Sequence, residues 1–283
     1  MFTTIISTTV LNDNLNSKNW IIIDCRSFLG QTEKGHQDYL KSHIPNAQYV
    51  HLDNDLSDEI IAGKTGRHPL PSKSAAAELF STLGIGQNTQ VIAYDQGHGG
   101  IAARLWWLLN WLGHEKVAVL NGGWAKWQAD NLAVNAETTT VKKQEFKIKE
   151  SAFVAIDASF VENASKTATH LIVDSRTAPR YRGEHEPIDP IAGHIPNAVN
   201  LPFLDNLKDG VFLSKEDLQK RFEAILKNKK PEETVFYCGS GVTACHNILA
   251  MKHAGLGVAV LYAGSWSDWI TDSNRNVSST LVD

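Results

Sequence analysis

Four segments of this chain occur twice, in the same order, with the copies roughly 140–150 residues apart. The matched pairs are WIIIDCRS with LIVDSRT, HIPNA with HIPNA, VIAYD with TVFYC, and VAVLNGGWAKW with VAVLYAGSWSDW. One long period of this kind indicates duplicated domains, because solenoid repeats recur about every 20–50 residues. We predict a first domain over 1–134, a polar linker over 135–150, and a second domain over 151–283.

Each half has the pattern of an α/β domain. Short apolar runs such as IIID, VIAY and VAVL do not alternate with polar residues, which is typical of buried parallel strands. Between them lie amphipathic segments: in IAARLWWLLNWLG, Ile101, Leu105 and Leu108 share one helical face, and Gly113 suits the end of the helix. Strands that alternate with helices predict, in each half, a parallel sheet covered by helices on both faces.

The composition is that of an ordinary globular protein. A net charge of −4 gives no reason to expect binding to nucleic acid or to a membrane. No apolar run is long enough to span a membrane, and the start MFTTIISTTV lacks the basic residues of a signal peptide. Three cysteines without a C-x-x-C pair argue against a disulfide framework or a zinc site, so we expect a reducing, cytoplasmic setting.

The most informative loop is CGSGVT, which begins at Cys238. It follows the apolar run TVFY and enters a helical pattern, so it lies at the carboxyl edge of the predicted sheet, where α/β domains usually hold ligands. Backbone N–H groups of a glycine-bearing loop, together with the start of a helix, can stabilise a thiolate there. The first half has Asp95 at the matching place, so only the second half can carry out sulfur chemistry at this loop. The alternative is a buried structural cysteine.

These motifs resemble those of tandem rhodanese-family sulfurtransferases, from about residue 20 to residue 269. The resemblance rests on the two D-x-R strands, the two HIPNA segments, the CGSGVTACH loop and the GSWSDW ending. It implies an inactive first domain and a catalytic second domain in which Cys238 accepts sulfur as a persulfide. The sulfur then passes to a thiol acceptor such as thioredoxin, or to cyanide. No metal or organic cofactor is implied.

The residues after the cysteine indicate which small molecule donates the sulfur. Thiosulfate enzymes of the family typically place Arg and Lys there, because thiosulfate is a dianion, whereas this chain has Gly239 and Ser240. The loop therefore resembles that of the branch that uses 3-mercaptopyruvate. We expect 3-mercaptopyruvate as the donor. A thiosulfate:cyanide sulfurtransferase and a non-catalytic rhodanese-like sulfur-carrier or interaction module are the alternatives; the intact cysteine argues against the module.

The resemblance also implies a proton relay. Ser240 matches a serine proposed to relay a proton, His68 in GRHPLP aligns with a first-domain histidine, and Asp53 aligns with the aspartate that orients this histidine. The three residues would meet across the domain interface and protonate the pyruvate enolate. The alternatives are a solvated loop histidine and a surface turn aspartate. The expected catalytic residues are thus Cys238, Ser240, His68 and Asp53.

Substrate binding is expected at an arginine and at the backbone of the cysteine loop. Arg180 in PRYRGE matches the family's carboxylate-binding arginine, and the second arginine of that site is missing, because EPIDP stands in its place. Arg182 and His185 are candidates to replace it. The expected substrate-binding residues are Arg180, Gly239, Gly241, Val242 and Thr243.

Overall fold

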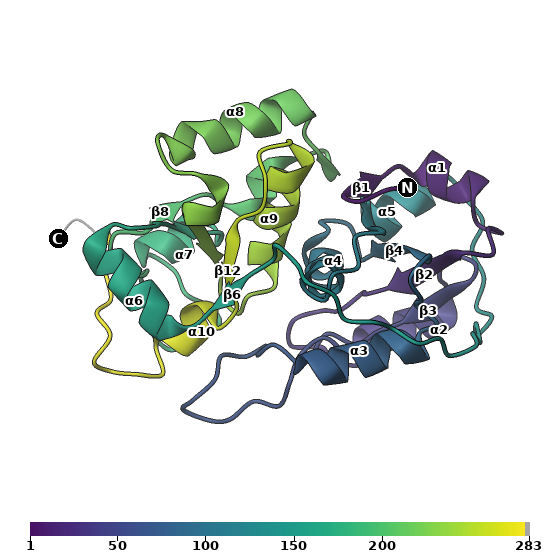
Figure 1. The fold of residues 1–283 in the computed structure, drawn as a ribbon, viewed down its shortest axis with the longest axis horizontal. Helices are drawn as coiled ribbons and strands as arrows, with labels where there is room; N and C mark the ends of the chain where they lie inside the picture. Colours follow the sequence, from purple (N-terminus) through teal and green to yellow (C-terminus); the bar gives the residue numbers. More distant parts are fainter. Residues whose placement is uncertain (281–283) are drawn as a thin grey trace. The chain divides into compact units, whose positions relative to one another are not determined.

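The computed structural model describes residues 1–280, which form two compact units (Figure 1). Each unit takes most of its residues from one half of the chain, and each also contains one short segment from the other half. The first unit consists of Met1–Asp58, Leu70–Ala152 and Asp209–Phe212. The second consists of Glu59–Pro69, Phe153–Lys208 and the chain from Leu213 onward.

The first unit is built on a five-stranded sheet with the strand order β1-β5-β4-β2-β3, in which neighbouring strands are parallel. The strands are β1 (Ile5–Ile6), β2 (Trp20–Asp24), β3 (Ala47–Tyr49), β4 (Gln90–Tyr94) and β5 (Val117–Leu120). The helices are α1 (Thr8–Asp13), α2 (Lys34–Lys41), α3 (Lys73–Thr82), α4 (Gly100–Trp111) and α5 (Gly123–Ala129). Every residue of β4 is buried, as its unbroken apolar run predicts.

The second unit repeats this topology with the order β6-β12-β11-β7-β8, again with parallel neighbours. Its sheet strands are β6 (Ala155–Ile156), β7 (Leu171–Asp174), β8 (Val199–Asn200), β11 (Thr234–Tyr237) and β12 (Val260–Tyr262). Its helices are α6 (Ala158–Thr167), α7 (Ala178–Arg182), α8 (Lys215–Leu226), α9 (Thr243–His253) and α10 (Ser265–Trp269). Its short elements are η1 (Phe203–Asn206), β9 (Leu207–Lys208) and η2 (Pro231–Glu233), whereas the short strand β10 (Val211–Phe212) belongs to the first unit. The predicted pair of α/β domains with parallel sheets is confirmed.

The segment 135–150, which the sequence predicts as a linker, lies along the first unit. Asn135 exchanges backbone hydrogen bonds with His43, and the N–H of Gln144 donates to the carbonyl of Ser81. The segment has no helix or strand, in agreement with its lack of hydrophobic periodicity.

The D-x-R repeats have a structural role in both units. Arg26 pairs with Asp24 and lies over the ring of Trp124, with 4.4 Å between the guanidinium carbon and the ring centroid. Arg176 pairs in the same way with Asp174, at 2.6 Å, in the second unit. These side chains are buried, so each ion pair fixes the carboxyl end of a central strand.

In the part of the chain that the structure describes, no helix has the length and apolar character needed to cross a membrane.

Candidate active site

Cys238 lies in the loop between β11 and α9, and 2% of its surface is exposed. The loop is held by the turn at the start of α10. The N–H of Cys238 donates to Oγ of Ser265 over 3.0 Å, and its carbonyl accepts the N–H of Trp266 over 3.0 Å. The carbonyl of Gly239 accepts the N–H of Ser267 over 2.9 Å. The backbone around the cysteine is therefore fixed before any substrate arrives.

The sulfur atom accepts a backbone hydrogen bond. The N–H of Gly241 points at Sγ of Cys238 over 3.1 Å. Gly241 has a φ of +76°, and a Cβ at this position would lie 2.2 Å from the carbonyl oxygen of Ala263. Only glycine can adopt this conformation in this space, so the residue type follows from the turn that aims the N–H at the sulfur. The sulfur of Cys238 is therefore a hydrogen-bond acceptor in this turn.

The Asp95 loop of the first unit, which matches the Cys238 loop, shows that this backbone conformation binds an anion. One carboxylate oxygen of Asp95 accepts the N–H groups of Gly97 and Gly99, over 3.0 and 2.9 Å. The other oxygen accepts those of Ile101 and Ala102, over 2.9 and 3.3 Å. Four backbone donors thus converge on one anion at the start of α4. The carboxylate fills this cradle permanently, and it cannot form a persulfide.

The other two cysteines have the opposite hydrogen-bond polarity. The thiol of Cys25 donates to the carbonyl of Ile23, and the thiol of Cys245 donates to that of Gly241 over 3.3 Å. Both side chains are fully buried. Burial, followed by the charges of nearby carboxylates, raises the pKa of the Cys25 thiol well above its ordinary value. In these two residues the sulfur atom is a hydrogen-bond donor, whereas in Cys238 it is an acceptor.

Ser240 and His68 are in direct contact. Nδ1 of His68 lies 2.7 Å from Oγ of Ser240, a distance that allows proton transfer between the two side chains. His68 belongs to the segment Glu59–Pro69, which is part of the second unit. The N–H of Arg67 donates to Oγ of Ser267 over 3.1 Å, so the segment is held by the same turn that holds the cysteine loop. In Figure 1 this segment is the long blue loop before α3.

The remaining expected site residues lie as follows. Val242 and Thr243 complete the cysteine loop, and Thr243 is the first residue of α9. Asp53 lies in the first unit, where its N–H donates to Nδ1 of His51 over 3.1 Å. The catalytic roles expected of Asp53, His68 and Ser240 stay predictions.

Arg180 lies beside the cysteine loop, together with an arginine that sequence reasoning missed. A Cβ at Gly239 would lie 3.4 Å from Nη2 of Arg180 and 2.9 Å from Nη2 of Arg67. Arg67 directly precedes His68 in GRHPLP. This neighbourhood is the one feature of the sequence from which Arg67 could have been predicted as a site residue. Arg182, one of the two candidates for the missing arginine, instead forms an exposed pair with Glu184.

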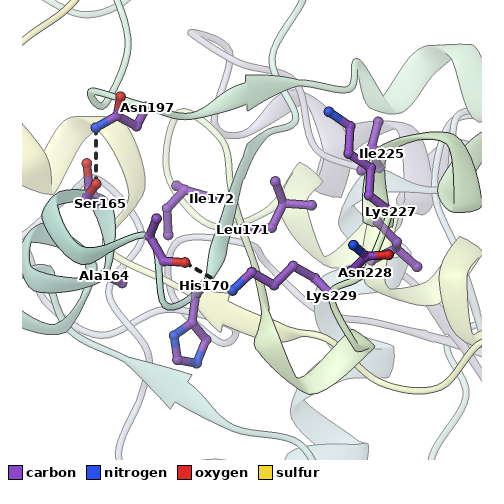
Figure 2. Close-up of a pocket in the computed structure, with 12 residues that line it drawn as sticks. Ala164, Ser165, His170, Leu171, Ile172, Asn197, Ile225, Lys227, Asn228 and Lys229 are labelled. Carbon is purple, nitrogen blue, oxygen red and sulfur yellow. Dashed lines mark hydrogen bonds between the residues drawn. The ribbon is translucent and has the colours of Figure 1, made fainter.

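The pocket in Figure 2 lies elsewhere in the second unit and has a volume of about 310 Å³. Leu171, the first residue of β7, lines it and pairs with Thr234 at the start of β11, whereas Cys238 follows the end of that strand. Lys229 crosses the pocket region and donates to the carbonyl of Ala168 over 3.0 Å (Figure 2). This pocket is at the amino edge of the sheet, so it is separate from the Cys238 loop.

Within residues 1–280, no cluster of His, Cys, Asp or Glu is suited to hold a metal ion.

Known proteins share both the sequence and the fold. The model of the rhodanese-like domain matches twice, over residues 7–130 and 157–272. A "probable 3-mercaptopyruvate sulfurtransferase" from Pseudomonas aeruginosa is 44% identical over 267 residues, which cover 94% of each chain. A "putative thiosulfate sulfurtransferase SseB" from Mycobacterium tuberculosis is 34% identical over 263 residues, 90% of this chain and 89% of the relative.

The crystal structure of SseA from Escherichia coli, described as a 3-mercaptopyruvate sulfotransferase, superposes with a TM-score of 0.80 at 30% identity. The superposition covers 94% of this chain and all of the SseA chain. The two family matches fall on the two halves of the duplication and include both the Asp95 loop and the Cys238 loop. The chain is therefore a member of the rhodanese-like family and carries two of its domains in tandem.

Proposed function

We propose that this protein is a sulfurtransferase that moves a sulfur atom from 3-mercaptopyruvate to a thiol or to cyanide. The observation that supports this most is the hydrogen bond from the N–H of Gly241 to Sγ of Cys238, in a loop that has no charged side chain of its own. The 3-mercaptopyruvate names of the relatives at 44% and 30% identity agree with it. A non-catalytic module would not require a nucleophile held in this way.

The reaction runs in two transfers. The Cys238 thiolate attacks the sulfur of 3-mercaptopyruvate, an S–S bond forms, and the C–S bond breaks with its electron pair left on carbon. The product is the enolate of pyruvate, which takes up one proton. Ser240 and His68 form the hydrogen-bonded pair that is close enough to the loop to deliver it. An acceptor thiolate, such as that of thioredoxin, or cyanide then attacks the outer sulfur and releases the Cys238 thiolate.

The donor preference is the first test of this proposal. We expect kcat/KM to be higher with 3-mercaptopyruvate than with thiosulfate for the same purified protein, because Gly239 and Ser240 add no positive charge to the loop. The measurement is steady-state transfer to cyanide and to a thiol from each donor. A higher kcat/KM with thiosulfate would replace the donor in the proposal and leave the nucleophile unchanged.

A second candidate donor has support of its own. The relative from Mycobacterium tuberculosis is named as a thiosulfate sulfurtransferase. Arg67 and Arg180 also bring two guanidinium groups to the edge of the loop at Gly239. Thiosulfate therefore stays the alternative donor, and the same comparison of kcat/KM separates the two.

Replacement of Arg180 by alanine tests how the donor carboxylate is held. The loss of a charge-assisted hydrogen bond of roughly 1.5–3 kcal/mol should lower kcat/KM for 3-mercaptopyruvate about 10- to 150-fold. Alkylation of Cys238 by neutral iodoacetamide should proceed at the wild-type rate. Arg182→Ala is the matched control, because its exposed pair with Glu184 is of little energetic value. An equal loss in the two variants would argue against a specific role of Arg180.

The cellular setting is part of the proposal. Within residues 1–280 none of the three cysteines forms a disulfide, and persulfide transfer requires Cys238 to remain a thiol between turnovers. We place the protein in the reducing cytoplasm, where thiol acceptors are kept reduced.

A further inference from the structure

Beside the cysteine loop, two arginines share one aspartate. Asp189 pairs through Oδ1 with Nη1 of Arg67 and through Oδ2 with Nη2 of Arg180, the latter over 3.2 Å. Arg180 also donates to Glu186, over 2.7 and 3.0 Å. Arg67 comes from the segment Glu59–Pro69, whereas the other three residues follow β7, and all four belong to the second unit. One carboxylate thus bridges two guanidinium groups that converge from different parts of the chain.

The two arginines face the place where a donor must approach. Both guanidinium groups lie within 3.5 Å of the position that a Cβ of Gly239 would occupy, next to Cys238. Nε of Arg67 is buried and has no hydrogen-bond partner among the described residues. A buried, unsatisfied donor is costly, so Nε of Arg67 would gain from a hydrogen bond to an anion bound beside the loop.

The two carboxylates of the cluster are held very differently. Glu186 is fixed by Arg176 over 3.2 Å and by the N–H groups of Ile188 and Asp189, both over 3.1 Å. These bonds fix Arg180 in turn. Among the described residues, the partners of the Asp189 carboxylate are the two arginines. Burial raises the pKa of Asp189 above its ordinary value in spite of them, so its charge is held at a cost.

We propose that Arg67 and Arg180 together bind the anionic group of the sulfur donor, and that Asp189 is a specificity-determining residue that competes with this group. The inference deepens the proposed function and rests on Cys238 as its nucleophile. Asp189 occupies the arginine pair as an internal carboxylate, and a donor carboxylate must displace it or share the pair with it. With Glu186 included, two positive and two negative charges balance, so the site offers little net attraction to a dianion.

The test compares two alkylating agents that react with the same sulfur. Iodoacetate carries a carboxylate and iodoacetamide does not, so the ratio of their rate constants at Cys238 reports on anion binding and does not depend on turnover. Asp189→Asn removes one negative charge at nearly constant shape and should raise the iodoacetate-to-iodoacetamide ratio by about fivefold or more. Arg67→Met should lower the ratio by about fivefold or more. Arg182→Met is the matched control and should leave the ratio within about twofold of wild type.

Asp189→Ser serves as a second variant, and the iodoacetamide rate alone shows whether the loop stays intact in each protein. A ratio that is unchanged or lowered in both Asp189 variants would overturn the competition. A ratio that is unchanged in Arg67→Met would remove Arg67 from the donor site. The alkylation rates can be measured even if 3-mercaptopyruvate is not a substrate. Failure of this inference can therefore be distinguished from failure of the proposed function. Whichever donor the wild type prefers, Asp189→Asn should raise kcat/KM for thiosulfate more than kcat/KM for 3-mercaptopyruvate. The reason is that a dianion gains more than a monoanion when one negative charge is removed from the site.

Discussion

Cys238→Ser is expected to abolish sulfur transfer with every donor and every acceptor. A serine hydroxyl at this position would meet the same N–H of Gly241, but it is a much weaker nucleophile at neutral pH and cannot store sulfane sulfur. Wild-type protein incubated with a donor should gain one sulfur atom on the peptide that contains Cys238. Mass spectrometry of the digested protein measures this adduct, and Cys238→Ser should lack it.

The other cysteines are the controls for this experiment. Cys25→Ser and Cys245→Ser replace fully buried thiols that donate to backbone carbonyls, so both variants should retain the adduct and the turnover. Added sulfur on Cys25 would contradict the assignment of the nucleophile. It would also contradict the raised pKa that burial gives the Cys25 thiol.

The sequence predicted the architecture because duplication tests each assignment twice. A strand inferred from WIIID is supported by LIVD in the other half, and both are central strands that end in the same Asp–Arg pair. Trp106, Trp107, Trp124 and Trp127 are buried in the first unit, and Trp111 is partly buried. Local patterns and internal comparison are sufficient for such features, because the order of equivalent strands is the same in both units.

The site could be predicted only where its residues lie in one motif. Cys238 and its glycines form a contiguous loop, so the turn that aims the N–H of Gly241 could be anticipated from CGSGVT. Arg67 and Asp189 could not be paired in advance, because their contact depends on where the segment Glu59–Pro69 folds. That segment leaves its own half of the sequence, and nothing in its composition marks it as part of the second unit.

The segment also changes how the histidine is understood. His68 was expected to reach Ser240 from the first domain across an interface. The structure includes its segment in the second unit, fixed through Arg67 and Ser267 at the turn at the start of α10 that also holds the cysteine loop. The short His68–Ser240 contact is therefore a feature internal to one compact unit. The His68–Ser240 pair can keep its geometry as long as the second unit itself stays folded.

His68→Ala is expected to slow transfer from 3-mercaptopyruvate by about 10²- to 10⁴-fold, the usual contribution of a positioned acid–base group. The physical reason is that this donor leaves as an enolate, which must be protonated, and Nδ1 of His68 is 2.7 Å from the Ser240 hydroxyl. Thiosulfate releases sulfite and forms no enolate, so sulfur transfer from thiosulfate should be slowed much less. Ser240→Ala should show the same asymmetry between donors, and Asp53→Asn should act in the same direction but more weakly.

The test of the relay is the loss of kcat/KM with 3-mercaptopyruvate divided by the loss with thiosulfate. A folding defect would slow transfer from both donors and leave this ratio near one. The measurement is kcat/KM for each donor in wild type, His68→Ala and Ser240→Ala, with His170→Ala as the matched control. His170 lines the pocket at the opposite edge of the sheet, so its loss should leave both donors unchanged (Figure 2). Equal slowing of both donors by His68→Ala, or no slowing of either, would mean that the contact with Ser240 is structural. The enolate would then take its proton from water, and a slow step before protonation would limit turnover.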